Sequence, residues 1–155
     1  MANRFLATDD SLAALLARLT LGIVIFPHGA QKLFGWFGGP GFNGTLGMFE
    51  QYFGLPALLT VLVIIAEVFG GLGLIVGFLT RLSAIGVGLV LLGAIFLGGH
   101  VDNGFFMNWT GQQAGEGFEY HLLGIGLALV VLRLGGGRWS VDRAITARKH
   151  RTAHR

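Results

Sequence analysis

Glu67 points most directly to chemistry, because it is a lone carboxylate within a long apolar stretch. An ionised carboxylate in hydrocarbon is costly unless it faces a cavity, finds a partner or stays protonated. Arg18 is the other charge within an apolar stretch, and its long side chain can carry the guanidinium toward the middle of a membrane. We therefore interpret Glu67 and Arg18 as candidate catalytic residues that hold or transfer a proton. The alternative is a buried ion pair that only fixes the register of two helices.

A second group of polar residues lies where apolar stretches begin or end, and we expect it on one side of a membrane. Its members are His28, Lys32, His100, Glu119 and His121. Imidazoles, an ammonium and a carboxylate together can bind a small anion, protonate a reduced quinone or hold a metal. The spacing matches no metal-ligand motif such as His-Glu-x-x-His, so we predict a small-molecule site and no metal site. The alternative is that these residues cap helices or extend to the interface as ordinary boundary groups.

The composition indicates that lipid surrounds the elements that position these residues. The chain has 155 residues, of which 53% are hydrophobic and 12% charged, whereas soluble domains carry about 25% charged residues. This excludes a disordered chain and argues against a cytosolic globule. The absence of cysteine excludes disulfides and thiol chemistry. Seven of the eleven Lys and Arg lie from Arg133 onward, but no nucleic-acid motif accompanies them, so we expect no nucleic-acid partner.

The apolar stretches predict an all-α, transmembrane four-helix bundle formed by one domain, residues 1–155. The expected spans are residues 12–28, 55–78, 82–99 and 120–134. Each comes near the roughly 20 residues that cross a bilayer, and backbone polar groups in lipid must be paired within a helix. In the loop 29–54, Phe42, Leu46, Phe49 and Phe53 recur at helical spacing, which predicts a short re-entrant or interfacial helix.

The distribution of basic residues predicts the orientation of this bundle. Arg4, Arg81 and the basic tail 138–155 mark the cytoplasmic side, whereas the loop 98–119 has no Lys or Arg. Both termini are therefore expected in the cytoplasm, with the first and third loops outside. Small residues within the spans, such as Gly73 and Gly77, allow close helix packing.

Four segments in order resemble the DoxX family of small bacterial four-helix membrane proteins. They are H-G-A-Q-K-L-F-G (28–35), A-E-V-F-G-G-L-G-L-I-V-G-F-L-T-R (66–81), His100 followed by N-G-F-F (103–106), and G-G-G-R-W-S-V-D-R (135–143). Gly136 and Trp139 depart mildly from the Pro and Tyr that the family often has there.

The resemblance implies a cytoplasmic-membrane protein linked to redox chemistry, since a relative forms the large subunit of a thiosulfate:quinone oxidoreductase. It also implies that the polar positions recur in the family without fixing their roles. It adds Arg81 to the candidate binding residues, which are then His28, Lys32, Arg81, His100, Glu119 and His121.

Our first hypothesis is a multi-pass protein of the bacterial inner membrane that serves as a subunit of a quinone-linked oxidoreductase. A quinone or small anion binds in the bundle, and a cofactor or partner supplies electrons, because the sequence has no obvious redox centre. Whether the chain is an enzyme by itself stays open. The alternative is a non-enzymatic scaffold, a homo-oligomer whose basic tail docks a soluble redox enzyme. A small oligomeric transporter is the third, less favoured reading.

Overall fold

The computed structural model describes residues 5–152, so Arg4 and the last residues of the basic tail lie outside the described part of the chain. Helices and one 3-10 turn are the regular elements of this part, which confirms the all-helical prediction. They are α2 (Leu12–Phe34), η1 (Trp36–Gly38), α3 (Gly41–Phe53), α4 (Ala57–Val76), α5 (Thr80–Leu97), α6 (Glu119–Leu134) and α7 (Val141–Thr152).

Three of these helices, α2, α4 and α5, are long and apolar enough to cross a membrane. Their outward faces are apolar as well, and Phe69, Leu89 and Phe96 each expose more than half of their surface. A soluble helix would place charged residues on that face. The outer surface of these helices therefore suits contact with lipid chains. Helix α6, with 16 residues, is shorter.

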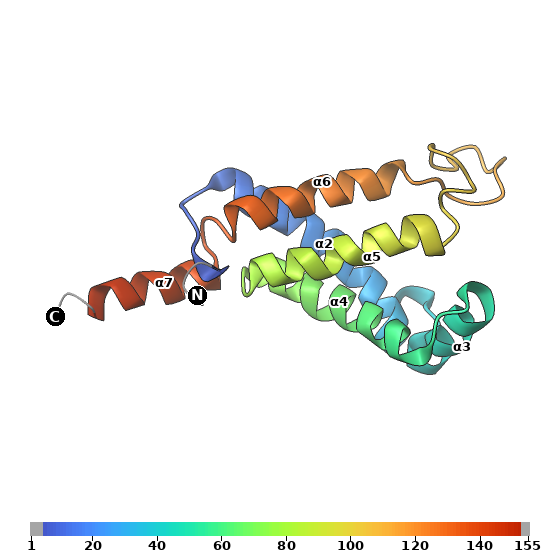
Figure 1. The fold of residues 1–155 in the computed structure, drawn as a ribbon, viewed down its shortest axis with the longest axis horizontal. Coiled ribbons are helices and arrows are strands. Elements are labelled where there is room, and N and C mark those ends of the chain that lie inside the picture. The colour runs from blue at the N-terminus through green and yellow to red at the C-terminus, as the bar shows by residue number, and fades with distance from the viewer. Residues whose placement is uncertain (1–4, 153–155) are drawn as a thin grey trace.

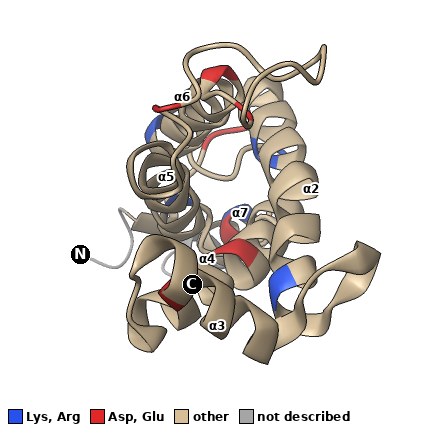
Figure 2. Cartoon of the chain, turned by 90° about the vertical axis from the view of Figure 1, so that its right-hand side faces the viewer, with Lys and Arg blue, Asp and Glu red and all other residues tan. Residues whose placement is uncertain are grey.

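The long helices surround a common apolar core. Helix α2 packs against α4 and α6, and α5 packs against the same two helices, so that the four form a ring in the end-on view of Figure 2. Leu21, Leu74, Val87 and Val131 are among the buried side chains at its centre. Helices α2 and α4 approach each other closely, and a Cβ placed on Gly29 would lie 2.7 Å from the backbone nitrogen of Val68.

The two ends of the ring differ in what they carry (Figure 1). The loop end holds α3 and the long connection 98–118 between α5 and α6. The termini end holds the N-terminal arm (residues 5–11), the α4–α5 turn, the Gly-rich loop 135–140 and α7, which extends away from the ring. The helix expected in the first loop is present as α3.

Helix α2 is longer than the expected span, which ended at His28. It continues through Pro27 to Phe34, and its end is capped by Gly35, whose N–H donates to the carbonyl of Gln31 at 3.2 Å. Proline is tolerated inside membrane helices because neighbouring groups satisfy the freed carbonyl. The extension places His28 and Lys32 on one face, because residues four apart in a helix are neighbours.

Candidate functional site

An ion pair between α2 and α4 forms the centre of the candidate site. The Nζ of Lys32 lies 2.7 Å from Oε2 of Glu67 and donates a hydrogen bond to Oε1 at 3.0 Å. Glu67 is buried, with 5% of its surface exposed. The partner expected for Glu67 was Arg18, and that expectation is wrong. The ammonium of Lys32 comes from the last turn of α2, whereas the expected span ended at His28 and left Lys32 in a loop.

Two local features hold Lys32 in place. Gly29 lets the backbones of α2 and α4 approach closely, one turn before Lys32. Thr45 of α3 is fully buried, and its hydroxyl lies 3.1 Å from the carbonyl of Lys32 and 2.8 Å from that of Gly41. A hydroxyl has one hydrogen to share between these acceptors. Helix α3 is thereby fastened to the end of α2 that carries the ion pair.

The carboxylate of Glu67 keeps unused acceptor capacity. Among the described residues, no donor reaches its buried Oε2 in hydrogen-bond geometry, even though the ammonium lies close to it. A carboxylate can accept about four hydrogen bonds, and an ammonium has three hydrogens to give. Both members of the pair can therefore still bind a further polar group.

A large apolar groove leads to this ion pair. Its volume is about 1110 Å³, and α3, α4 and α5 supply nearly all of its lining. Lys32, Glu67 and His100 also line it. Apolar side chains make up most of the walls, including Phe49, Phe53, Leu62, Phe69, Leu82 and Leu89. Several of them are widely exposed, so the groove opens toward the surroundings of the helices.

The structure gathers the histidines at the same end as the ion pair. The rings of His100 and His121 are in contact, tilted by 49° with centroids 4.2 Å apart, and His28 lies within electrostatic range of Lys32, Glu67 and His121. The Nδ1 of His100 lies 2.8 Å from the carbonyl of Glu116. A carbonyl only accepts, so this Nδ1 carries a hydrogen.

His121 is the more buried of these two histidines, with 9% of its surface exposed. No group in residues 5–152 hydrogen-bonds to its buried Nδ1. In the same part of the chain, no group of three or more His, Cys, Asp or Glu side chains is arranged to hold a metal ion.

Glu119 belongs to the same end but fastens the long loop. Its Oε1 accepts hydrogen bonds from the backbone N–H of Met107, at 3.0 Å, and from Nε1 of Trp109, at 3.4 Å. These contacts hold residues 107–109 against the start of α6. Glu119 thus lies at the expected end, with its carboxylate already engaged by the loop.

Arg18 lies at the termini end, away from Glu67. It is 2% exposed and donates to carbonyls of α4 and of the Gly-rich loop. Its five hydrogen bonds go to Leu74, Ile75, Gly136, Arg138 and Trp139, at 2.6–3.2 Å. Leu74 is seven residues from Glu67, which is about 10 Å along the helix.

Arg81 lies at the termini end as well, apart from the other candidate binding residues. Its guanidinium donates to the carbonyls of Phe5, Ala7 and Leu132. These bonds tie the N-terminal arm and the end of α6 to α5. The structure therefore does not bring Arg81 into the polar group that it was expected to join.

Asp142 is a buried acidic residue that is not among the predicted site residues. It is 1% exposed, and its carboxylate accepts from the backbone N–H groups of Leu79 and Thr80, at 2.8 and 2.9 Å, and from the Thr80 hydroxyl at 2.7 Å. It caps the start of α5 from the first turn of α7. One signal was available, because Asp142 is the only acidic residue after Arg133.

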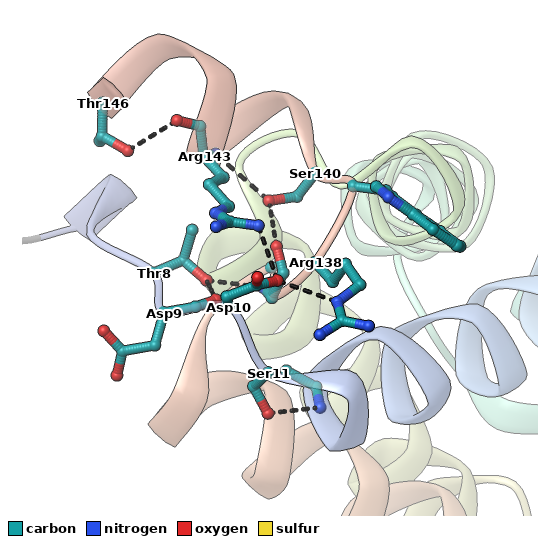
Figure 3. Close-up of polar contacts among 12 residues, drawn as sticks. Thr8, Asp9, Asp10, Ser11, Arg138, Ser140, Arg143 and Thr146 are labelled. Carbon is teal, nitrogen blue, oxygen red and sulfur yellow. Dashed lines mark hydrogen bonds and ion pairs between the residues drawn. The ribbon is translucent and has the colours of Figure 1, made fainter. Parts of the chain in front are cut away.

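Exposed ion pairs join α7 and the Gly-rich loop to the N-terminal arm (Figure 3). Oδ1 of Asp10 lies 3.0 Å from Nε of Arg138 and 2.6 Å from Nη1 of Arg143. The hydrogen bond from Arg138, followed by the charges of both arginines, lowers the pKa of Asp10 below its ordinary value of 3.8. Gly137 adds a backbone bond to the hydroxyl of Thr8.

Comparison with known proteins gives one matching family and two relatives. The model of the DoxX family matches residues 13–100, more than half of the chain. A Bacillus subtilis protein named "Putative oxidoreductase CatD" is 32% identical over 54% of this chain and 58% of its own length, less than two thirds of that protein. The Escherichia coli "Inner membrane protein YqjF" is 28% identical over 88% of this chain and 94% of its own length. No solved structure matches the chain.

Proposed function

Because this chain belongs to the DoxX family of membrane proteins, we propose that it is a multi-pass protein of the bacterial inner membrane that binds a quinone. Helices α2, α4, α5 and α6 are the proposed spans, and the termini end faces the cytoplasm. Arg81, Arg138 and Arg143 at that end support this orientation, because basic residues gather on the cytoplasmic side of membrane proteins. The name of the relative YqjF also supports the location.

The groove whose wall includes the Lys32–Glu67 pair carries the proposal. A membrane quinone has a long apolar chain and a small polar headgroup, and the groove offers apolar walls with one pair of charged groups among them. The acceptor capacity that remains on Oε2 of Glu67 supports a further polar partner at the pair. The residues present therefore fit a quinone headgroup at the ion pair with its chain along α4 and α5.

The side chains at the loop end have distinct proposed roles. Lys32 donates a hydrogen bond to a headgroup oxygen, and Glu67 holds or accepts a proton beside it. His28 lies one turn before Lys32 on α2 and is proposed to pass protons to or from the pair. A quinone supplies two-electron redox chemistry when bound, and a partner or cofactor must exchange the electrons with it. Arg18 is proposed to be structural, since its donors are occupied by carbonyls.

Filling the groove tests this proposal. Gly93 lines the groove, and a Cβ at this position meets no atom within 4 Å, so Gly93→Phe puts a ring into open space. Gly126 of α6 has the same free space and lies outside the groove lining, so Gly126→Phe is the matched control. Binding of decylubiquinone to protein in nanodiscs should weaken at least about tenfold in Gly93→Phe only. Equal binding by both variants would contradict the proposed site.

A second candidate function is a membrane anchor for a soluble redox enzyme, and α7 favours it. This helix extends beyond the ring and is fastened at its base by Asp142 and by the pairs with Asp10 (Figures 1 and 3). A basic arm of this kind suits an acidic partner. Deleting the chain after Thr146 keeps the Asp142 contacts. Such a variant should lose the partner in co-purification if the anchor function is right, and keep it otherwise.

A further inference from the structure

The hydrogen-bond capacity of the ion pair distinguishes the two redox forms of a quinone. Glu67 presents a buried oxygen that can only accept while the carboxylate is ionised, and Lys32 presents hydrogens that can only be donated. A headgroup at this pair therefore meets an acceptor and a donor side by side. The ligand that fits best can satisfy both with one polar group.

A quinone carbonyl and a quinol hydroxyl differ in this respect. The carbonyl accepts from Lys32 but has no hydrogen to give to Glu67, whose Oε2 then has only the Lys32 ammonium, at 2.7 Å, beside it. The hydroxyl can accept from Lys32 and donate to Glu67 at the same time. A hydrogen bond to Glu67 matters because its side chain is buried: 7% of it is exposed, against 18% for Lys32. A buried acceptor without a donor costs more than one that water can reach.

We propose that the Lys32–Glu67 pair selects the reduced ligand, a hydroquinone with a long apolar chain, over the oxidised quinone. This rests on the proposed function and names the redox form that the site prefers. The preference comes from Glu67, which can accept a hydrogen bond only from the hydroquinone. Lys32 donates a hydrogen bond to either form. The chain thus holds the hydroquinone at the ion pair more tightly than it holds the quinone.

A competition experiment in nanodiscs tests the selectivity. The protein is placed in phosphatidylcholine, whose headgroup has no hydroxyl, and tritiated decylubiquinone is displaced under argon by decylubiquinol or by unlabelled decylubiquinone. Empty nanodiscs correct for partition into lipid. The wild-type protein should bind the quinol about tenfold more tightly, the ratio expected when one buried acceptor gains its donor.

Two variants locate the source of the selectivity. Glu67→Gln replaces the carboxylate by an amide that also donates, so the quinol-to-quinone ratio should fall to about one. Glu50→Gln, at an exposed position of α3, should keep the wild-type ratio. If Glu67→Gln does not fold, Lys32→Gln combined with Glu67→Gln removes both charges and is measured instead.

The outcomes separate this inference from the function on which it rests. Tighter quinol binding that is lost in Glu67→Gln supports the inference. Equal binding of both forms by the wild-type protein, or an unchanged ratio in Glu67→Gln, overturns it and leaves quinone binding in place. Binding of neither form overturns the proposed function as well.

Discussion

Lys32 and Glu67 join the last turn of α2 to the middle of α4, with 2.7 Å between Nζ and Oε2. The pair lies on the wall of the apolar groove, about midway along α4, and α3 fastens the Lys32 backbone through Thr45. The contact therefore connects the groove with helix α3, which forms part of its wall. Its removal should affect both stability and binding.

Breaking this pair on one side should destabilise the protein. Lys32→Met leaves the buried carboxylate of Glu67 without its cation and should lower the free energy of unfolding by about 3 kcal/mol. The double variant Lys32→Met with Glu67→Leu removes both charges and should recover most of that loss. Unfolding in mixed detergent micelles, followed by tryptophan fluorescence, measures both. A double variant no more stable than the single one would show that the pair does not make this contribution.

We expect Arg18 to contribute to the stability of the protein and not to ligand binding. Arg18→Lys keeps the charge but loses the planar fork that reaches carbonyls of Leu74, Ile75 and Gly136. The loss should be about 2 kcal/mol or more, because buried acceptors are left unpaired. Binding of decylubiquinone by the folded variant should change by less than about twofold, since distant sites act independently. Arg133→Lys, at an exposed position, is the control. Strongly reduced binding by folded Arg18→Lys would restore Arg18 to the site.

The close contact of α2 with α4 should make Gly29 intolerant of a side chain. In Gly29→Ala the new Cβ would lie 2.7–2.9 Å from atoms of Val68 and Glu67, so the helices must separate. We expect a loss of about 1–3 kcal/mol. Gly126→Ala meets no atom within 4 Å and should be neutral or stabilising by up to about 1 kcal/mol. Unfolding of the two variants under the same conditions decides the point, and similar losses would argue against close packing here.

The base of α7 should loosen in acid. The pKa of Asp10 is lowered in the folded protein, chiefly by the hydrogen bond from Arg138, so its contribution is present above the ordinary value of 3.8 and is lost as pH falls through the lowered pKa. The chain has no cysteine, so a spin label on Ala144→Cys reports on α7 alone. Its mobility should rise below this pH.

The neighbouring carboxylate provides the control for that experiment. In Asp10→Asn the label should already be more mobile at neutral pH and should respond less to acid. Asp9→Asn, at an exposed carboxylate beside Asp10, should behave like the wild-type protein. Identical mobility in all three proteins would mean that Asp10 does not hold the base of α7.

Apolar stretches predicted the helices well, because long runs without charge leave few other structures in lipid. The polar group at the loop end was also predictable in part, since His28, His100 and His121 lie at the ends of those stretches. The partner of Glu67, in contrast, could not be predicted. An expected span that ends at His28 leaves Lys32 in a loop. Arg18 lies within that span and is then the candidate partner for Glu67.

Contacts across the fold explain the other differences. Asp142 lies in a basic segment far along the chain from Thr80, and only the docking of α7 brings the two together. Arg81 and Arg18 look like candidate site residues in sequence, but both point at backbone carbonyls of distant loops. Such carbonyls are present at every residue, so no pattern of residue types indicates which of them will lack a partner.

Photoaffinity labelling with an azidoquinone in native-lipid particles tests quinone binding at the groove most directly. After irradiation and digestion, mass spectrometry locates the labelled peptides. We expect labels on Met48, Phe49 and Phe53 of α3 and on Leu62, Val63 and Ala66 of α4, which line the groove, and we expect excess decylubiquinone to suppress them. Labels spread evenly over the lipid-facing helices, or confined to α6 and unaffected by excess quinone, would contradict quinone binding at the groove.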